Sequence, residues 1–263
     1  MFISHKYKVI FIHIQRTGGS SVTKLFSEED NELVSHVPID SAKMRTMHCY
    51  ASDIKAALET ELFESYTKFC IVRNPFDRMV SWYFRFKNGF QSDAYPTRGF
   101  SFMVHHLLNK KNMPKKYWLR KYWAYFSRLI QGGAVNTEKE LSSREQLVGS
   151  KLMYEVAEKA KTFEDFIALP DKYNNPMFER FCTDQLDYIS EDQKILVDRV
   201  LRFEELPRDF NLLAKDIGMN GRLPHVNASR ESTGGYRDYY SERSKDIITK
   251  RFQRDLEYFN YQY

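Results

Sequence analysis

A strand, a glycine turn and a helix at the start of the chain constrain its fold more than any other feature. Residues 8–14 (KVIFIHI) are rich in β-branched and aromatic side chains and too short for a typical helix, so they indicate a buried strand. The next segment, 15–21 (QRTGGSS), has two glycines that let the backbone bend sharply and approach a ligand closely. Either of the serines can cap the following helix, whose first N–H groups attract an anion. The predicted phosphate contacts are Arg16, Thr17, Gly18, Gly19, Ser20 and Ser21.

A second strand and helix carry another anion-binding pattern. Residues 68–72 (KFCIV) are again short and apolar, and Pro75 suits the first turn of a helix because its missing N–H is not needed there. Arg73 therefore follows the carboxyl end of a strand, where open α/β sheets bind their ligands. Ser81 lies close to two helical turns later, so it can share one phosphate with Arg73. A structural ion pair between Arg73 and Asp77 is the alternative.

Both patterns resemble those of sulfotransferases that use 3′-phosphoadenylyl sulfate (PAPS). The turn QRTGGSS resembles their 5′-phosphosulfate loop, most closely the IQKTGGT form of heparan sulfate 6-O-sulfotransferases, with Arg16 at the family's lysine. The segment 71–83 (IVRNPFDRMVSWY) resembles their 3′-phosphate-binding element. The resemblance implies that PAPS is the sulfuryl donor, that Arg16 and its loop bind the 5′-phosphate, and that Arg73 and Ser81 bind the 3′-phosphate.

The C-terminal part of the chain continues the resemblance. Residues 198–206 (DRVLRFEEL) and 223–229 (LPHVNAS) follow the layout of bacterial and Golgi-type carbohydrate sulfotransferases. The likeness implies a single sulfotransferase domain over residues 1–263 that acts on a carbohydrate-type acceptor. Residues 88–175 match no segment of that family, and we expect a helical insert there that shapes the acceptor site.

The order of elements predicts the fold class. Strands that alternate with helices indicate an α/β, P-loop-like three-layer fold, with a central, mostly parallel sheet flanked by helices. A third strand is expected at 200–203. The expected helices are Ser52–Leu62 with Ser52 as its cap, Phe100–Leu108, Tyr117–Ile130, one capped by Thr162, one ending at Gly218, and a last one carrying Ile248, Phe252, Leu256 and Phe259.

Sulfuryl transfer to a hydroxyl needs a group that accepts the hydroxyl proton, and histidine suits this role near neutral pH. His48, within 47–54 (MHCYASDI), resembles the histidine of the HADWTEL segment in the heparan sulfate 6-O-enzymes, which is the proposed base there. We therefore predict His48 as the base and Arg16 as the stabiliser of charge on the departing 5′-phosphate. A structural or substrate-positioning role for His48 stays open, and His105 and His106 are rival bases.

Other polar residues have more than one interpretation. His13 alternates within the first strand, which is typical of a packed core histidine. Arg78 is as well suited to bridging helix and sheet as to touching a ligand, and His225 to loop architecture or a cofactor contact.

Two other classes of function stay open. A Mg²⁺-dependent P-loop kinase or NTPase needs a lysine directly after the second glycine and an acidic metal ligand after a strand. Ser20 and Arg73 stand at those positions, so we expect no metal. The other class is a non-catalytic module that binds a nucleotide or a glycan.

Composition bears on partner and compartment. The net charge of +5 favours polyanionic partners in general. Basic and aromatic residues mix at 110–125, which fits the solvated face of a helix, a glycan acceptor that could be anionic, or single-stranded nucleic acid. No known nucleic-acid-binding motif accompanies them, so nucleic acid is the least favoured. No apolar segment approaches the ~20 residues of a membrane span. The three scattered cysteines indicate a reducing compartment, and we expect a cytoplasmic enzyme.

Overall fold

The computed structural model describes residues 1–35, 37, 47–89, 152, 155–221, 223 and 235–263. They belong to one compact unit, Met1–Ser92 with Leu152–Tyr263, and residues 93–151 lie outside the described residues. The helices predicted at 100–108 and 117–130 also lie outside them. The organisation as a single domain with an insert therefore stays a prediction.

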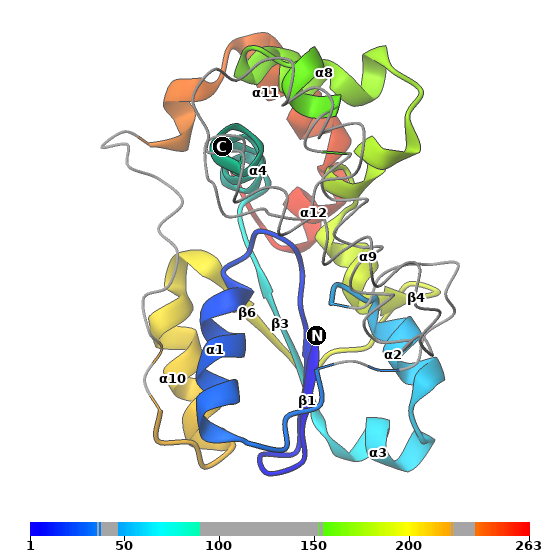
Figure 1. The fold of residues 1–263 in the computed structure, drawn as a ribbon, viewed down its shortest axis with the longest axis vertical. Coiled ribbons are helices and arrows are strands. Elements are labelled where there is room, and N and C mark those ends of the chain that lie inside the picture. Colours follow the sequence, from blue (N-terminus) through cyan, green and yellow to red (C-terminus); the bar gives the residue numbers. More distant parts are fainter. Residues whose placement is uncertain (36, 38–46, 90–151, 153–154, 222, 224–234) are drawn as a thin grey trace, which may run out of the picture. The chain divides into compact units, whose positions relative to one another are not determined.

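The described unit is built on a four-stranded sheet (Figure 1). Its strands are β1 (Phe2–Ser4), β2 (Val9–Ile12), β3 (Thr67–Val72) and β6 (Arg199–Arg202), hydrogen bonded in that order. β2, β3 and β6 run parallel, whereas β1 pairs antiparallel with β2. The three predicted strands are confirmed, and the short β1 is an addition. Because β2 and β3 are parallel neighbours, the two predicted phosphate-binding turns leave the same edge of the sheet.

Helices connect these strands and complete an α/β arrangement. They are α1 (Gly19–Glu29), α2 (Ala51–Ala57), α3 (Thr60–Ser65), α4 (Pro75–Gly89), α8 (Phe163–Lys172), α9 (Gln185–Ile189), α10 (Leu206–Asp216), α11 (Glu242–Arg251) and α12 (Gln253–Tyr258). The shorter elements are the 3₁₀ turns η2 (Pro176–Phe181), η3 (Phe203–Glu205) and η4 (Tyr236–Tyr239), and the hairpin of β4 (Ser190–Glu191) with β5 (Lys194–Ile195).

Alternation along β2 gives each face of the sheet its own apolar core. Val9 and Phe11 belong to a cluster formed with residues of α1 and α10. Ile10 and Ile12 belong to a second cluster, formed with residues of α2 and α9. Successive strand residues point to opposite faces, so helices must cover both. Figure 1 shows α1 and α10 together on one side of the strands.

A third apolar cluster joins α4 to α8 and α11. Aromatic rings dominate it: Trp82 stacks on Phe86 of the same helix at 5.3 Å, and Phe166 lies 4.8 Å from Phe181 between ring centroids. α8 falls within the sequence range of the predicted insert, 88–175, yet it packs into the core of the described unit. This packing holds in place α4, the helix that carries Ser81.

Several helix boundaries differ from the predictions. α1 begins at Gly19, and Gly18 precedes it at φ 87°, so neither Ser20 nor Ser21 caps it. The region expected as one helix, Ser52–Leu62, forms α2 and α3, because Leu58 and Glu59 are extended. α2 begins one residue before Ser52, where the Asp53 carboxylate accepts from the Tyr50 N–H, so Ser52 is not its cap.

The C-terminal region also differs in one respect from the prediction. The last helix is divided into α11 and α12 at Phe252, although Ile248, Phe252 and Phe259 are buried as expected. Three predicted boundaries are confirmed: Thr162 caps α8, Pro75 begins α4, and Gly218 follows α10 at φ 71°. No described helix combines the length and apolarity needed to cross a membrane.

Buried carboxylates connect α9 to α12. Asp255 is fully buried and accepts hydrogen bonds from the backbone N–H groups of Gln185 and Leu186 at 2.8 and 2.9 Å. Asp184 is buried beside it and accepts from Arg254 at 3.2 Å. Burial, with the negative charges of Asp255 and Asp187, raises the pKa of Asp184 to about 7. Ionisation of Asp184 therefore lowers the free energy of unfolding.

This cost predicts a pH-dependent effect of Asp184→Asn. A carboxyl whose pKa is raised on folding contributes stability below its unfolded pKa and loses that contribution as pH rises through 7. The variant, which cannot ionise, should gain about 1–2 kcal/mol in free energy of unfolding over wild type between pH 5 and pH 8, since Arg254 and solvent screen part of the charge. Urea denaturation at several pH values measures this gain. Asp187→Asn, at a more exposed neighbour that pairs with the same arginine, is the control; equal pH profiles for both variants would contradict the assignment.

Candidate functional site

The first glycine turn joins β2 to α1 through residues in the left-handed backbone region. Arg16 has φ 67° and Gly18 has φ 87°. A Cβ on Gly18 would lie 2.9 Å from the Phe203 ring, and one on Gly19 would lie 2.4 Å from the His13 ring. The turn therefore needs both glycines, Gly18 for its backbone conformation and Gly19 for a close contact. The conformation of Arg16 costs about 1–3 kcal/mol, which the contacts of its side chain offset.

The hydroxyl groups of this turn are placed differently from one another. Thr17 is fully buried, and its hydroxyl donates to the Ile14 carbonyl at 2.9 Å. Ser20 is exposed, whereas Ser21 is buried. The Thr17 hydroxyl is thus engaged in holding the turn, so we expect Thr17 to contact a phosphate through its backbone N–H.

The second turn leaves β3 at Arg73, and distant segments fix its backbone. Gln185 accepts from the Arg73 N–H at 2.9 Å and donates to the Arg73 carbonyl at 2.8 Å. The Asn74 N–H donates to Glu204 Oε1 at 2.7 Å. The Asn74 side chain donates to the Gln262 carbonyl at 2.8 Å. Residues of α9, η3 and the C-terminal segment thus orient the strand end from which Arg73 projects.

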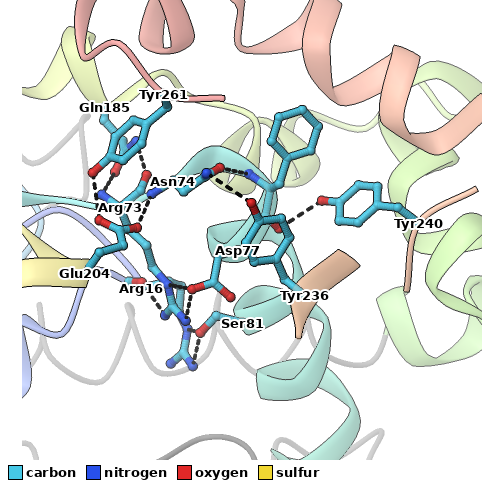
Figure 2. A network of polar contacts seen from close by, with 11 residues as sticks. Arg16, Arg73, Asn74, Asp77, Ser81, Gln185, Glu204, Tyr236, Tyr240 and Tyr261 are labelled. Atoms are coloured by element: carbon cyan, nitrogen blue, oxygen red, sulfur yellow. Dashed lines mark hydrogen bonds and ion pairs between the residues drawn. The ribbon is translucent and has the colours of Figure 1, made fainter. Parts of the chain in front are cut away.

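Arg16 of the first turn contacts both Ser81 of α4 and Arg73 of the second turn (Figure 2). Ser81 Oγ accepts from Arg16 Nε at 3.2 Å and from Arg16 Nη2 at 2.9 Å. Arg73 Nη1 donates to the Arg16 carbonyl at 3.2 Å. The structure therefore brings together three predicted phosphate ligands, Arg16, Arg73 and Ser81, although they come from two separate parts of the sequence.

Arg73 also forms the ion pair considered as its alternative role. Its Nη2 lies 2.7 Å from Asp77 Oδ2, and its Nε donates to the same oxygen at 2.8 Å. The Arg73 guanidinium also packs on the Phe203 ring, 4.0 Å from the centroid. A guanidinium has five N–H donors in a planar fork, so one edge can pair with a carboxylate while other donors serve an anion. The ion pair and a phosphate contact are compatible.

Positive charge accumulates around Ser81. Burial, followed by the positive charges of Arg73 and Arg85, lowers the pKa of Arg16 to about 10, so Arg16 stays a cation at neutral pH. Arg85 is one helical turn beyond Ser81 on α4, and burial lowers its pKa too. Asp77 is the one carboxylate among these five side chains. The cluster is thus electrostatically prepared for an anion with more than one negative charge.

Arg78 binds protein backbone at this edge of the sheet. It is fully buried, and its Nε donates to the Gln15 carbonyl at 3.1 Å while its Nη1 donates to the Thr183 carbonyl at 3.0 Å. Gln15 directly precedes Arg16, so Arg78 fastens α4 to the first turn. Of its two interpretations, the structure supports the bridging role.

His48 lies beside the first turn, and its ring contacts His13, the residue that directly follows β2. Its Nδ1 lies 2.9 Å from the His13 carbonyl, and the two imidazole centroids are 4.6 Å apart in a T-shaped arrangement. The ring is half-buried. A carbonyl can only accept, so Nδ1 is the donor and a neutral His48 carries its lone pair on Nε2. This tautomer suits a general base.

The other candidates are either elsewhere or outside the described residues. His5 is exposed and pairs with the Tyr66 hydroxyl at 2.7 Å. The rival bases His105 and His106, the loop residue His225 and the basic aromatic segment 110–125 all lie outside the described residues. Within the part of the chain that the structure describes, no three His, Cys, Asp or Glu side chains gather as metal ligands.

Sequence reasoning missed the residues that hold the site together. Gln185, Glu204 and Phe203 contact Arg73 or Asn74 from more than 100 residues away. Phe203 and Glu204 stand in the segment 198–206 that carries the resemblance, but their contacts with the second turn were not predicted. Arg85 had a detectable signal, because its spacing of four from Ser81 places both on one helix face.

The contact between Gly19 and His13 predicts the effect of Gly19→Ala. The added Cβ would lie 2.4 and 2.5 Å from His13 Cδ2 and Nε2, and both residues are buried. Overpacking of this kind should lower the free energy of unfolding by about 1–3 kcal/mol. Gly235→Ala is the matched control, since its Cβ would have no neighbour closer than 3.9 Å and should change stability by less than about 0.5 kcal/mol. Urea denaturation compares them, and equal stabilities would refute the contact.

Comparison with known proteins agrees with this geometry. The sulfotransferase family model matches residues 1–262, nearly the whole chain. Neither the curated proteins nor the solved structures contain a match. A match that spans both predicted phosphate-binding turns and the C-terminal helices shows that this chain belongs to the sulfotransferase family.

Proposed function

We propose that this protein transfers a sulfuryl group from PAPS to a hydroxyl of a carbohydrate-type acceptor. The observation that carries the proposal is the convergence of Arg16, Arg73 and Ser81 from two strand ends into one cationic cluster. Membership of the sulfotransferase family supports sulfuryl transfer as the reaction. The donor, the acceptor class and the residue roles below are parts of the proposal.

The residues present fit a nucleotide that is phosphorylated at both its 5′ and 3′ ends. Gly18 and Gly19 leave the start of α1 without side chains, where the helix N-terminus favours an anion. Arg16 with this turn would hold the 5′-phosphosulfate, and Arg73 with Ser81 the 3′-phosphate. The mostly parallel sheet with a glycine turn after β2 suits a P-loop-like fold.

His48 and Arg16 would perform complementary roles in the transfer. His48 Nε2 takes the proton from the acceptor hydroxyl as the new O–S bond forms. The S–O bond to the 5′-phosphate breaks, and its electron pair stays on the phosphate oxygen. Arg16 and the N–H groups of the turn stabilise that charge, each such donor contributing about 3 kcal/mol. The proton thus ends on His48, the sulfuryl group on the acceptor oxygen and the negative charge on the 5′-phosphate.

Charge and cysteine content bear on the acceptor and the compartment. The cationic cluster around Ser81 suits anionic ligands, including an anionic glycan. The segment 88–175, which we expect to shape the acceptor site, lies mostly outside the described residues. Cys70 and Cys182 are free thiols, which suits the cytoplasm.

Two alternatives are less well supported by the same residues. A Mg²⁺-dependent kinase would need a lysine after Gly19, where Ser20 stands, and an acidic residue after β3, where Arg73 stands. A non-catalytic binding module would not need a histidine held in the tautomer of a base, as His48 is.

Adenosine 3′,5′-bisphosphate should bind without a metal. At 100 times its Kd it should stabilise the protein by about 2.7 kcal/mol in thermal unfolding, with or without EDTA. Ser81→Ala should weaken binding about tenfold, because a charge-assisted hydrogen bond is lost. Arg16→Lys, which restores the lysine of the resembled loop, should bind normally. Ser27→Ala, at an exposed serine of α1, is the control. Preference for ATP–Mg²⁺ over the bisphosphate would overturn the proposal.

His48→Ala should abolish turnover but leave the nucleotide in place. Removal of a general base typically lowers kcat by about 10²- to 10⁴-fold. Affinity for the bisphosphate should stay within about twofold, since the phosphate ligands are unchanged. Steady-state kinetics and thermal shift measure the two effects, and His5→Ala at an exposed histidine is the control. Retained turnover would move the base assignment to His105 or His106.

A further inference from the structure

His13 lies between the candidate base and the phosphate-binding turn. On one side its ring is 4.6 Å from the His48 ring, centroid to centroid. Its Nε2 edge faces the first residue of α1, where a Cβ on Gly19 would come within 2.5 Å. Phe11 stacks on the ring at 5.3 Å. The imidazole is thus enclosed by Phe11, His48 and Gly19, and only 7% of the residue is exposed.

His13 also fixes His48 through its backbone. The His13 carbonyl accepts the hydrogen bond from His48 Nδ1 at 2.9 Å. The preceding residue of that loop, Met47, is held by a hydrogen bond from the Met1 amino group to its carbonyl. His48 is therefore held both through its own ring and through its backbone neighbour.

The ring of His13 is neutral at physiological pH. Burial lowers the pKa of His13 well below its usual range, and the positive charges of His48 and of the N-terminal amine act in the same direction. A cation at position 13 would oppose protonation of His48, which is the event that base catalysis requires. A neutral, enclosed ring can support His48 without competing for its proton.

We propose that His13 is a positioning residue, whose carbonyl selects the Nδ1–H tautomer of His48 and whose neutral ring sets the separation between His48 and the phosphate-binding turn. This proposal rests on the proposed function, because it assigns His48 the role of base. His13 itself is too enclosed to touch a substrate, so it acts through His48. The contacts of its ring therefore give His13, which directly follows β2, a role beyond core packing.

Variants of His13 separate positioning from general packing. His13→Gln, which is neutral and reaches the position of the imidazole Nε2, should retain kcat within about threefold. His13→Ala, which leaves space beside the His48 ring, should lower kcat at least tenfold. Its affinity for adenosine 3′,5′-bisphosphate should change by less than about threefold, because Arg16, Arg73 and Ser81 remain. Equal losses of kcat and affinity in His13→Ala, or no loss of kcat, would overturn the proposal.

Nuclear magnetic resonance of ¹⁵N-histidine-labelled wild-type protein tests the same proposal without any substrate. His48→Ala and His13→Gln spectra assign the two rings. Neutral His48 should carry its proton on Nδ1, and His13 should stay neutral at a pH where His5 is protonated. An Nε2–H tautomer of His48, or a cationic His13 at neutral pH, would refute the positioning role even if His13→Ala fails to fold. Absence of bisphosphate binding in wild type, with the expected tautomer, would instead count against the proposed function.

Discussion

The parallel pairing of β2 with β3 is the constraint on which the rest of the site depends. It places Ile12 opposite Cys70, so that the chain leaves both strands at the same edge of the sheet. Arg16 and Arg73 follow those strand ends, and α4 returns Ser81 to the same place. Each turn alone would hold an isolated cation. Pairing of the strands makes them one site.

Assembly of this site brings several positive charges together, and specific contacts reduce their repulsion. Asp77 neutralises part of the charge of Arg73, and the Phe203 ring accepts its flat face. Arg78 donates to the backbone carbonyls of Gln15 and Thr183. Arg85 adds further positive charge near Arg16, whose pKa it lowers together with burial and Arg73. A multiply charged anion is the ligand that such an arrangement recognises best.

Local sequence rules predicted the elements that carry the site well. The strands at 8–14 and 68–72 and the helix beginning at Pro75 are where periodicity and proline placed them. The same rules succeeded at Thr162, which caps α8, but failed at the caps of α1 and α2. Ser20, Ser21 and Ser52 suit a helix start by residue type, but Gly18 with its left-handed backbone and Tyr50 precede the helices instead. Several residue types can begin a helix, so the tertiary path of the chain decides among them.

The sequence by itself indicated which residues to propose as phosphate ligands, because turn chemistry and the order of glycines, arginine and serines are local properties. It also determined the family, through motifs preserved at both ends of the chain. Only the tertiary structure decided that Thr17 directs its hydroxyl into the turn, that Gln185 and Glu204 hold the second strand end, and that His48 rests on His13. Except for the Thr17 contact with Ile14, these contacts join residues far apart in sequence. Their partners are selected by packing and strand pairing, which leave no local pattern to read.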